Sequence, residues 1–415
     1  MPKYHIKTFG CAMNVSDSER IASFLEKQGF ILAKKTELAD LVVFNTCGIR
    51  QTAENRAYGM IHDLRKKHKD TKIILTGCLA NRKDVQIRMK KVVDLFTEIK
   101  DFPKNFSKKQ MNYLCIKPKH TNKFQAYVPI MTGCNKFCSY CVVPYARGRE
   151  ISRPAKEIEK EVQALIKKGY KHIILLGQNV NSYKDDGINF SKLLKKINTI
   201  PGNFWISFVS SHPKDFSNEL IETIAKCKKV CEWVHLPIQS GNDKILERMN
   251  RRYTQKHYLG LIKKIRLAFK KYKPDSLYSI SSDIIVGFPG ETKKQFMDSA
   301  EVAQKAKFDM VFFGQFSPRP ETVAWKIKDN VSKKEKVRRE KILNEILKKT
   351  ATENNKKYVG RKIDILIEKQ INNIYFGKTR TMKNVKIKSK IKNLVGKIVK
   401  AKITKANIWN LEASF

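Results

Sequence analysis

The sequence predicts an α/β protein of three parts: an N-terminal parallel α/β domain, a partial barrel of six strand–helix units, and a small C-terminal β-barrel. Three observations support this prediction. Strand and helix patterns alternate through the first hundred residues, recur through the middle of the chain, and give way to short β-rich runs from about Tyr358. We place the three domains at residues 1–115, 120–350 and 358–415.

The N-terminal part has the strand–helix order of a parallel sheet. Its apolar strands are expected at residues 4–9, 41–44 and 73–75, and its helices at residues 16–28 and 52–68. The following stretch, residues 99–123, is polar, rich in lysine and poorly periodic, so we expect a linker there.

The middle part repeats the same signals, with six strands separated by helices, as in a partial (β/α)6 barrel. The strands are expected at residues 127–131, 172–176, 205–209, 233–237, 278–286 and 310–316. In such barrels the loops at the carboxyl ends of the strands build the site. Those loops carry glycine, amide and hydroxyl residues here, at 177–181, 210–213, 237–241 and 283–291. Taken one at a time, each is also an ordinary turn.

The C-terminal part predicts a five-stranded barrel, a shape often used to grip single-stranded nucleic acid. We expect strands at 362–367, 384–387, 397–403 and 408–411, with turns at Gly377 and Gly396. From residue 361 to the end there are 14 Lys and Arg against 3 Asp and Glu, a net of +11. Tyr375, Phe376 and Trp409 are candidates for stacking on bases, or else form the core of the barrel.

The whole chain is strongly basic, with a formal net charge of +45. This favours a polyanionic partner, most simply nucleic acid, although a lysine-rich genome would give the same balance. The first residues, 1–10, show no apolar signal region, no apolar run reaches membrane length, and nine cysteines form no disulfide framework. We expect a cytoplasmic protein with free thiols and no membrane contact.

Cys134, Cys138 and Cys141 lie within eight residues, directly after the first expected barrel strand. Close thiolates are the usual ligands of iron–sulfur clusters, and three ligands would leave one iron free to bind something that is not protein. The alternatives are a zinc site or a disulfide. Structural zinc normally takes four ligands, and no fourth Cys or His lies nearby, so the spacing favours iron–sulfur.

Cys11, Cys47 and Cys78 each follow the carboxyl end of an expected N-terminal strand. Because ligands bind outside those ends in open α/β sheets, the three thiols could meet in one place. An isolated cysteine is more often a small buried hydrophobe, so spacing alone leaves both readings open.

The other cysteines and the last long helix look structural. We expect Cys115 to be a spare core residue and Cys227 and Cys231 to be core or surface thiols. Residues 332–357 read as a solvated connecting helix with an apolar stripe at Val337, Ile342, Leu343 and Ile346.

The sequence resembles the radical S-adenosylmethionine methylthiotransferases almost from end to end. The loop of Cys134, Cys138 and Cys141 matches the family's radical cluster motif. The segments around the other three cysteines, 8–19, 45–50 and 77–78, look like its auxiliary cluster motifs. Residues 133–148, 177–183 and 316–320 are similar to the branch that acts on isopentenylated tRNA, and residues 377–380 with Asn384 look like the signature of the family's RNA-binding TRAM domain.

Some positions depart from the family pattern. Ser207 stands where an arginine is usual, Glu321 and Val323 replace a usual glycine and proline, and Ala413 lies where glycine is common. None of these departures touches a cluster cysteine.

The resemblance implies two [4Fe–4S] clusters, one on Cys134, Cys138 and Cys141 and the other on Cys11, Cys47 and Cys78. The first would cleave S-adenosylmethionine to a 5′-deoxyadenosyl radical, which takes hydrogen from carbon 2 of an adenine. The second would deliver a sulfur already methylated by another S-adenosylmethionine. Such cofactors carry out chemistry that no acid–base route allows at an aromatic C–H bond.

The resemblance also implies contacts to the cofactor and to RNA. S-adenosylmethionine would bind Tyr140, Gln178, Asn179, Ser211, Gln239, Ile285, Val286 and Gly287, and the RNA would bind Arg361, Lys378, Arg380 and Lys383. The substrate would be isopentenylated adenosine next to the tRNA anticodon. We expect a monomer that takes its electron from a flavodoxin or a ferredoxin.

Two alternatives stay open. One is methylthiolation of threonylcarbamoyl-adenosine in tRNA, the reaction of a sister branch. The other is an iron–sulfur RNA-binding protein without catalysis.

Overall fold

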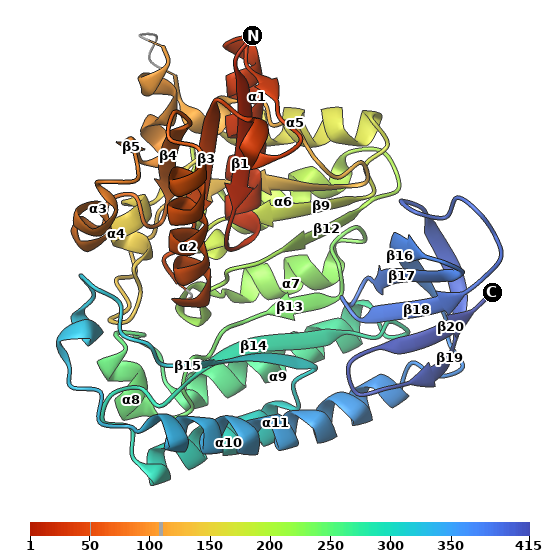
Figure 1. Cartoon of the computed structure of the whole chain (residues 1–415). Helices are drawn as coiled ribbons and strands as arrows, with labels where there is room; N and C mark the ends of the chain where they lie inside the picture. The colour runs from red at the N-terminus through yellow and green to blue at the C-terminus, as the bar shows by residue number, and fades with distance from the viewer. Residues whose placement is uncertain (50, 108–110) are drawn as a thin grey trace.

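The computed structural model describes residues 1–415 except residues 50 and 108–110. Its elements fall into three parts along the chain: an N-terminal sheet with its helices, a central open barrel, and a separate C-terminal barrel (Figure 1). The predicted fold class is therefore confirmed. Within the described ranges, no helix is both long and apolar enough to cross a membrane.

The N-terminal part is a parallel sheet in the strand order β2-β1-β3-β4-β5. Its strands are β1 (Lys3–Thr8), β2 (Ile31–Leu32), β3 (Leu41–Thr46), β4 (Lys72–Gly77) and β5 (Leu95–Phe96), and its helices are α1 (Ala12–Lys27), α2 (Gln51–Lys67) and α3 (Lys83–Met89). Helix α1 begins four residues earlier than the sequence predicts, because Cys11 takes an extended conformation as its N-cap. The first cysteine thus lies at the helix start.

The expectation of a linker over residues 99–123 is wrong for much of its length. The segment contains two short 3₁₀ helices, Ile99–Asn105 and Tyr113–Cys115, and Phe102 and Tyr113 are buried against the sheet. This stretch is polar and rich in lysine, yet a few apolar side chains bury enough area to fix it. The expectation for Cys115 is also wrong, because this residue is exposed rather than part of the core.

The central part contains all six predicted strands. They are β6 (Gln125–Pro129), β9 (His172–Leu176), β12 (Trp205–Phe208), β13 (Trp233–His235), β14 (Ser279–Val286) and β15 (Met310–Gln315). They form two parallel three-stranded sheets, β12-β9-β6 and β13-β14-β15, and the bridge Ile206–Val230 connects the two halves. Strands β6 and β15 are not paired in the described chain, so the barrel is open.

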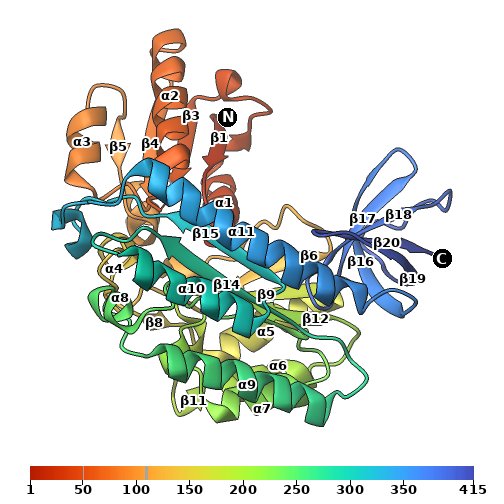
Figure 2. The same cartoon turned by 90° about the horizontal axis from the view of Figure 1, so that it is seen from below.

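Helices cover the outside of this barrel (Figures 1 and 2). They are α5 (Ala155–Lys167), α6 (Phe190–Thr199), α7 (Asn218–Lys226), α9 (Gln255–Tyr272), α10 (Lys293–Ala306) and α11 (Lys333–Lys356), with shorter helices α4 (Val143–Arg147) and α8 (Asp243–Arg248) near the site. Alternate strand residues such as Ile284 and Val286 enter one large core beneath the helices. The residues between them, such as Asp283 and Ile285, face the interior and are only half buried.

Helix α11 is packed rather than solvated, which corrects its predicted role. Leu343 and Leu347 are buried on its inner face, but so are Lys336 and Arg339, which the apolar stripe did not include. It follows the barrel from α10 toward the C-terminal part (Figure 2).

The C-terminal part is a closed five-stranded barrel in the order β16-β17-β18-β20-β19. Its strands are β16 (Lys362–Ile371), β17 (Ile374–Thr379), β18 (Asn384–Lys388), β19 (Ile398–Ala406) and β20 (Leu411–Ser414). Gly377 lies inside β17 instead of in the predicted turn. Glycine is needed there because a Cβ would overlap the carbonyl oxygen of Leu366 on the neighbouring strand. Tyr375 is part of the core, whereas Trp409 is 40% exposed.

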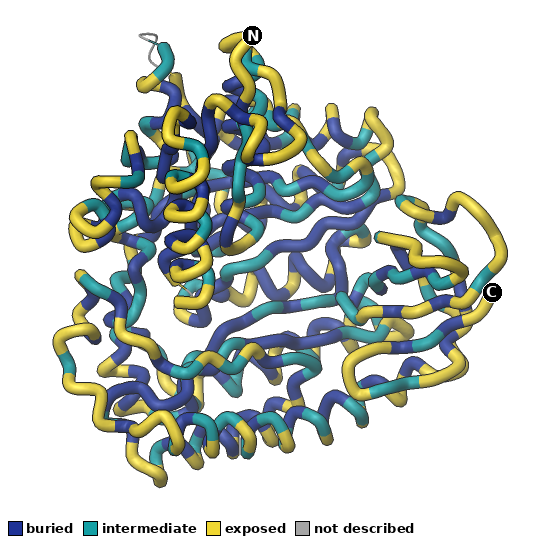
Figure 3. The backbone as a smooth tube through the Cα atoms, viewed as in Figure 1, coloured by how far each residue is buried: buried dark blue, intermediate teal, exposed yellow. Residues whose placement is uncertain are grey.

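Buried ion pairs join this barrel to the central one. Arg380 donates two 2.8 Å bonds to the Glu232 carboxylate, which also pairs with Lys273 at 2.7 Å. Lys383 pairs with Asp309 at 2.7 Å, and both side chains are about nine-tenths buried. Two of the four predicted RNA-binding cations, Arg380 and Lys383, therefore already have close ion-pair partners in the central domain. Figure 3 shows the exposed outer surface of the C-terminal barrel.

The structure shows the local surroundings of two residues that depart from the family pattern, Glu321 and Ser207. Glu321 has a φ of +71°, a conformation that glycine adopts without steric cost, so the usual glycine fits the local backbone better than glutamate. Ser207 is buried and its Oγ lies 2.8 Å from His172 Nε2, which gives the serine a partner inside the chain.

Candidate functional site

The loop of Cys134, Cys138 and Cys141 begins at a tight backbone crossing. Gly133 has a φ of +78°, and a Cβ there would overlap the carbonyl oxygen of Arg149. The Cys134 N–H donates to the Gly148 carbonyl at 3.1 Å. Gly133 directly follows the short strand β7 (Met131–Thr132), which itself follows the first barrel strand, β6. The cysteine loop therefore lies at the carboxyl end of that barrel strand.

The segment that follows α8 supports this loop. The Ser139 N–H donates to the Met249 carbonyl at 3.1 Å, its hydroxyl donates to the Arg248 carbonyl at 2.8 Å, and Asn250 Nδ2 donates to the Phe137 carbonyl at 3.0 Å. These bonds fix the loop between its cysteines.

Arg251, in the same segment, places its buried Nη1 3.6 Å from Cys138 Sγ and donates from Nη2 to the Pro237 carbonyl. A buried guanidinium at this distance orients the sulfur by donating a hydrogen bond to it. The sequence analysis missed Arg251, because no motif links it to the cysteines 110 residues earlier.

The three thiols share one environment. Burial raises the pKa of Cys134 to about 11 and that of Cys141 to about 12, and the Cys138 thiolate contributes to both shifts. With these raised pKa values, Cys134 and Cys141 stay protonated near neutral pH until a cation replaces their protons. The donor set therefore suits a positively charged iron–sulfur centre better than free thiolates.

Cys11, Cys47 and Cys78 also lie together. A Cβ placed on Gly10 would be 2.8 Å from Cys47 Cβ, and a Cβ on Gly48 would be 3.2 Å from Cys78 Cβ. Burial raises the pKa of Cys11, and nearby Cys78 raises it further. The topology thus brings three cysteines from three strand ends to one edge of the sheet, which is the first of the two arrangements that their spacing left open.

The two triplets meet at one domain interface. Val142, directly after Cys141, comes within 3.5 Å of the Cβ position of Gly48, directly after Cys47. Among the described residues, no three His, Cys, Asp or Glu side chains converge closely enough for a single metal ion. A cluster occupies a larger space between its thiolates than one zinc ion does.

The predicted cofactor loops contain buried polar atoms without partners. They are Gln178 Oε1, Asn179 Oδ1, Ser211 Oγ and His212 Nε2, all at the carboxyl ends of β9 and β12. Buried polar atoms are nearly always bonded in native proteins, so this group fits a polar ligand inside the barrel. The residues present therefore fit S-adenosylmethionine, as the resemblance implies.

Three more predicted cofactor residues offer a surface or a turn to a ligand, and a fourth, Val286, does not offer its side chain. Tyr140 and Ile285 pack on the same small apolar cluster, which could cover a planar base, and Gln239 has a φ of +72° at the neighbouring strand end. Val286 points into the outer core, so only its backbone is available to a ligand. Contact of all these residues with the cofactor remains a prediction.

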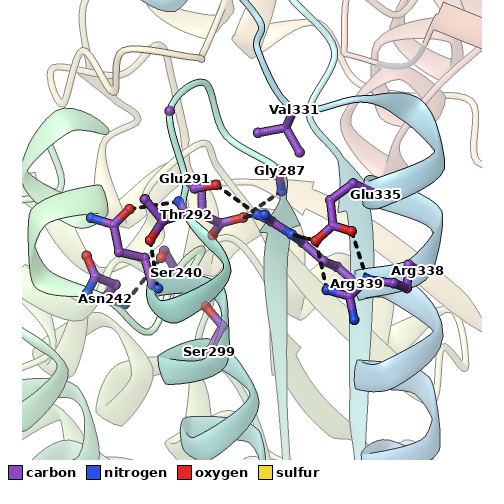
Figure 4. Close-up of polar contacts among 12 residues, drawn as sticks. Ser240, Asn242, Gly287, Glu291, Thr292, Ser299, Val331, Glu335, Arg338 and Arg339 are labelled. Atoms are coloured by element: carbon purple, nitrogen blue, oxygen red, sulfur yellow. Dashed lines mark hydrogen bonds and ion pairs between the residues drawn. The ribbon is translucent and has the colours of Figure 1, made fainter.

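Gly287 begins a turn that is held from behind by a buried network (Figure 4). Its N–H donates to Glu291 Oε2 at 2.9 Å, and the same oxygen accepts a 2.7 Å bond from Arg339 Nη1. Arg339 also pairs with Glu335 at 2.8 Å. Burial raises the pKa of Glu291, while the bonds from Gly287 and Arg339 lower it.

We expect Glu291→Leu to destabilise the protein by about 2–4 kcal/mol, because it leaves the buried Arg339 with only one carboxylate partner, Glu335, and frees the Gly287 N–H. Glu345→Gln is the matched control. It removes an exposed ion pair with Lys348 on α11, the helix that carries Arg339, and should cost less than about 1 kcal/mol. Urea unfolding of the metal-free protein measures both. Equal costs would contradict the structural role of the Glu291 network.

Two buried histidines predict a loss of stability in acid. Burial lowers the pKa of His172 to about 3 and that of His212 to about 2, from 6.5 in the unfolded chain. Both stay neutral in the folded state, so the unfolded state binds more protons once the pH falls below 6.5, and stability is lost there.

Between pH 7.5 and 5.5 we expect a loss of about 2–3 kcal/mol, the sum of both sites. Urea unfolding of the metal-free protein at the two pH values tests this, with the double variant His172→Gln and His212→Gln as control. A wild-type loss no larger than that of the double variant would count against it.

The remaining predicted RNA contacts are more exposed than Arg380 and Lys383. Arg361 donates to the Asp275 carbonyl at 3.1 Å at an exposed position, and Lys378 lies 3.8 Å from Glu368, with 39% of its side chain exposed. These two cations remain free enough to meet a phosphate.

Three family models match successive parts of the chain. The model of the uncharacterized protein family UPF0004 matches residues 3–98, that of the Radical SAM superfamily matches residues 128–303, and that of the TRAM domain matches residues 356–415. The order is the one that the sequence predicts.

Solved structures support the fold. A radical S-adenosylmethionine methyltransferase, TsrM, from Kitasatospora setae covers 78% of this chain and 75% of its own, with a TM-score of 0.56 at 14% identity. The cobalamin-dependent radical enzyme OxsB covers 85% of this chain and 56% of its own, with a TM-score of 0.51 at 10% identity.

Curated relatives match over almost the whole length. A tRNA-2-methylthio-N(6)-dimethylallyladenosine synthase of Clostridium botulinum is 40% identical, covering 99% of this chain and 96% of the relative. The enzyme of the same name from Thermoanaerobacter pseudethanolicus is 39% identical over 99% of this chain and 92% of its own. A [4Fe–4S] cluster and S-adenosylmethionine are implied by the radical domain. From end to end, this chain belongs to the radical S-adenosylmethionine methylthiotransferase family.

Proposed function

We propose that this protein methylthiolates carbon 2 of N6-isopentenyladenosine next to the tRNA anticodon, using two S-adenosylmethionine molecules and two [4Fe–4S] clusters. The observation that carries the proposal is the meeting of two cysteine triplets at one interface, with Val142 of one loop against Gly48 of the other. The names of the relatives support the choice of reaction and substrate.

Each triplet has its own task in this proposal. Cys134, Cys138 and Cys141 hold one cluster at the barrel mouth, and Cys11, Cys47 and Cys78 hold the other at the sheet edge. When bound, a reduced cluster and S-adenosylmethionine supply radical hydrogen abstraction, which can activate an aromatic C–H bond that no acid–base group can.

The chain's own residues position the reactants. Gln178, Asn179 and Ser211 offer buried polar atoms to the cofactor, and Tyr140 with Ile285 offers an apolar surface. The C-terminal barrel, rich in lysine, would hold the RNA backbone, so affinity for RNA should fall as salt rises. A reduced flavodoxin or ferredoxin would supply the electron.

Nucleoside analysis of tRNA from a deletion strain tests the substrate. Loss of the methylthio-isopentenyl nucleoside supports the proposal, whereas its persistence with loss of methylthio-threonylcarbamoyl-adenosine would assign the sister reaction instead.

A second assay tests catalysis itself. The reconstituted protein, given S-adenosylmethionine and a reductant, should release 5′-deoxyadenosine. If none forms, the protein is better described as an iron–sulfur RNA-binding protein.

A further inference from the structure

Two arginines of the central domain cross the domain interface, and each ends beside an auxiliary cysteine. Arg147, at the end of α4, reaches α1 of the N-terminal sheet, and Arg319, in the turn after β15, reaches the start of α2. Neither contacts the proposed cofactor site. We propose that Arg147 and Arg319 are positioning residues that hold the auxiliary cysteine loops in register with the radical-forming loop.

Arg147 acts on the Cys11 segment. Its Nη2 donates to Asp17 Oδ2 at 2.6 Å, and this pair is more than nine-tenths buried. Asp17 is also bonded to Tyr113, which fixes the carboxylate from the other side. The same Nη2 lies 3.5 Å from Asn14 Oδ1, the atom that accepts the 3.3 Å bond from Cys11 Sγ.

Asn14 in turn connects the Cys11 segment to β3. Its Nδ2 donates to Asn45 Oδ1 at 3.0 Å and to the Thr46 carbonyl at 2.8 Å. Thr46 directly precedes Cys47, so a shift at Arg147 would be passed to two of the three auxiliary cysteines.

Arg319 acts on the Cys47 segment. Its Nη2 donates to the Ile49 carbonyl and its Nη1 to Gln51 Oε1, both at 2.7 Å, and Glu54 lies 3.5 Å from Nη1. The Ile49 N–H points to Cys47 Sγ at 3.4 Å. The planar guanidinium thus holds both a carbonyl and an amide beside one cysteine, a geometry that lysine cannot reproduce.

The reaction itself gives a reason to fix the two cysteine loops relative to each other, because it requires precise positioning of the sulfur. Sulfur must reach a carbon whose hydrogen was removed at the other site, and a misplacement of about 1 Å can cost about 10²-fold in rate. A domain interface without buried polar contacts would be expected to move by more than this. Two buried arginine contacts, one to the Cys11 segment and one to the Cys47 segment, limit that motion.

The test separates radical formation from sulfur transfer, and it rests on the proposed two-cluster function. In the reconstituted enzyme we expect Arg319→Gln to form 5′-deoxyadenosine at the wild-type rate, while methylthiolated product per 5′-deoxyadenosine falls at least about 10-fold. Arg319→Lys keeps the positive charge but loses the two-pronged hydrogen bonding of the guanidinium, so it should show the same uncoupling to a smaller degree. It replaces the glutamine variant in the test if that variant does not fold. Arg65→Gln is the matched control, since every bond of Arg65 to a described residue stays within the N-terminal domain, and it should stay coupled.

Hydrogen–deuterium exchange of the metal-free protein gives a readout without catalysis. Arg319→Gln should speed exchange at the start of α2, and Arg147→Gln should speed it at the start of α1, with no change elsewhere in the sheet. If wild-type enzyme forms no product, the proposed function fails, and the exchange experiment alone decides this inference. The inference would be overturned if these variants kept the wild-type ratio of product to 5′-deoxyadenosine together with wild-type exchange rates. An equal loss of 5′-deoxyadenosine and product would also overturn it.

Discussion

Cys138→Ala is expected to abolish both 5′-deoxyadenosine formation and methylthiolation, a loss of about 10³-fold or more in each. Cys138 is the middle cysteine of its loop, and Arg251 and the bonds of Ser139 hold it in place. Without its sulfur the cluster would lose one of only three protein ligands, so the chemistry has no source of radicals.

The measurement is the yield of 5′-deoxyadenosine from reconstituted protein with S-adenosylmethionine and reductant, with the iron content determined in parallel. Iron should fall to about half, because the other triplet is untouched. Cys227→Ala is the control: this buried thiol belongs to neither triplet and should leave both values unchanged. Wild-type 5′-deoxyadenosine from Cys138→Ala would refute the assignment of this loop.

Cys47→Ala is expected to have the opposite pattern: 5′-deoxyadenosine still forms, but the methylthiolated product falls by about 10³-fold or more. Cys47 is buried between Gly10 and the Ile49 N–H, so the alanine variant removes one sulfur from the centre of the Cys11, Cys47 and Cys78 triplet. Removal of this ligand affects the proposed sulfur source and leaves the radical loop intact.

The same reconstituted protein, given an isopentenylated anticodon stem–loop, provides both readouts in one reaction. Cys115→Ser is the control, because Cys115 is exposed and lies beside Glu157 instead of the triplets. If Cys47→Ala still made product at the wild-type rate, the second cluster would have to be abandoned. Loss of both products would indicate that the two sites do not act separately.

Much of the fold could be predicted because the apolar patterns are local. Strand β9 runs from His172 to Leu176 as predicted, and the other barrel strands differ by only a few residues at their ends. The closeness of Cys134, Cys138 and Cys141 follows from their spacing in one loop. Strand ends that gather at one edge of a parallel sheet indicated that Cys11, Cys47 and Cys78 could meet, but a cluster there was implied only by the resemblance.

What could not be predicted depends on partners far away in the sequence. Arg380 looks like an RNA contact until the fold places Glu232 beside it, and Arg251 looks like a surface residue until Cys138 lies 3.6 Å away. Residues 99–123 look like a linker because their many lysines hide the few side chains that anchor them. Local composition contains no information on such long-range pairings.

The buried pairs of Arg380 and Lys383 also bear on the thermodynamics of RNA binding. A module on a flexible tether loses orientational freedom when it binds, and that loss weakens the complex. Here the orientation of the C-terminal barrel is already set during folding by Glu232 and Asp309. An RNA that spans both barrels therefore meets a preorganised surface. Its binding is not weakened by the entropy that would be lost if one domain had to be ordered against the other.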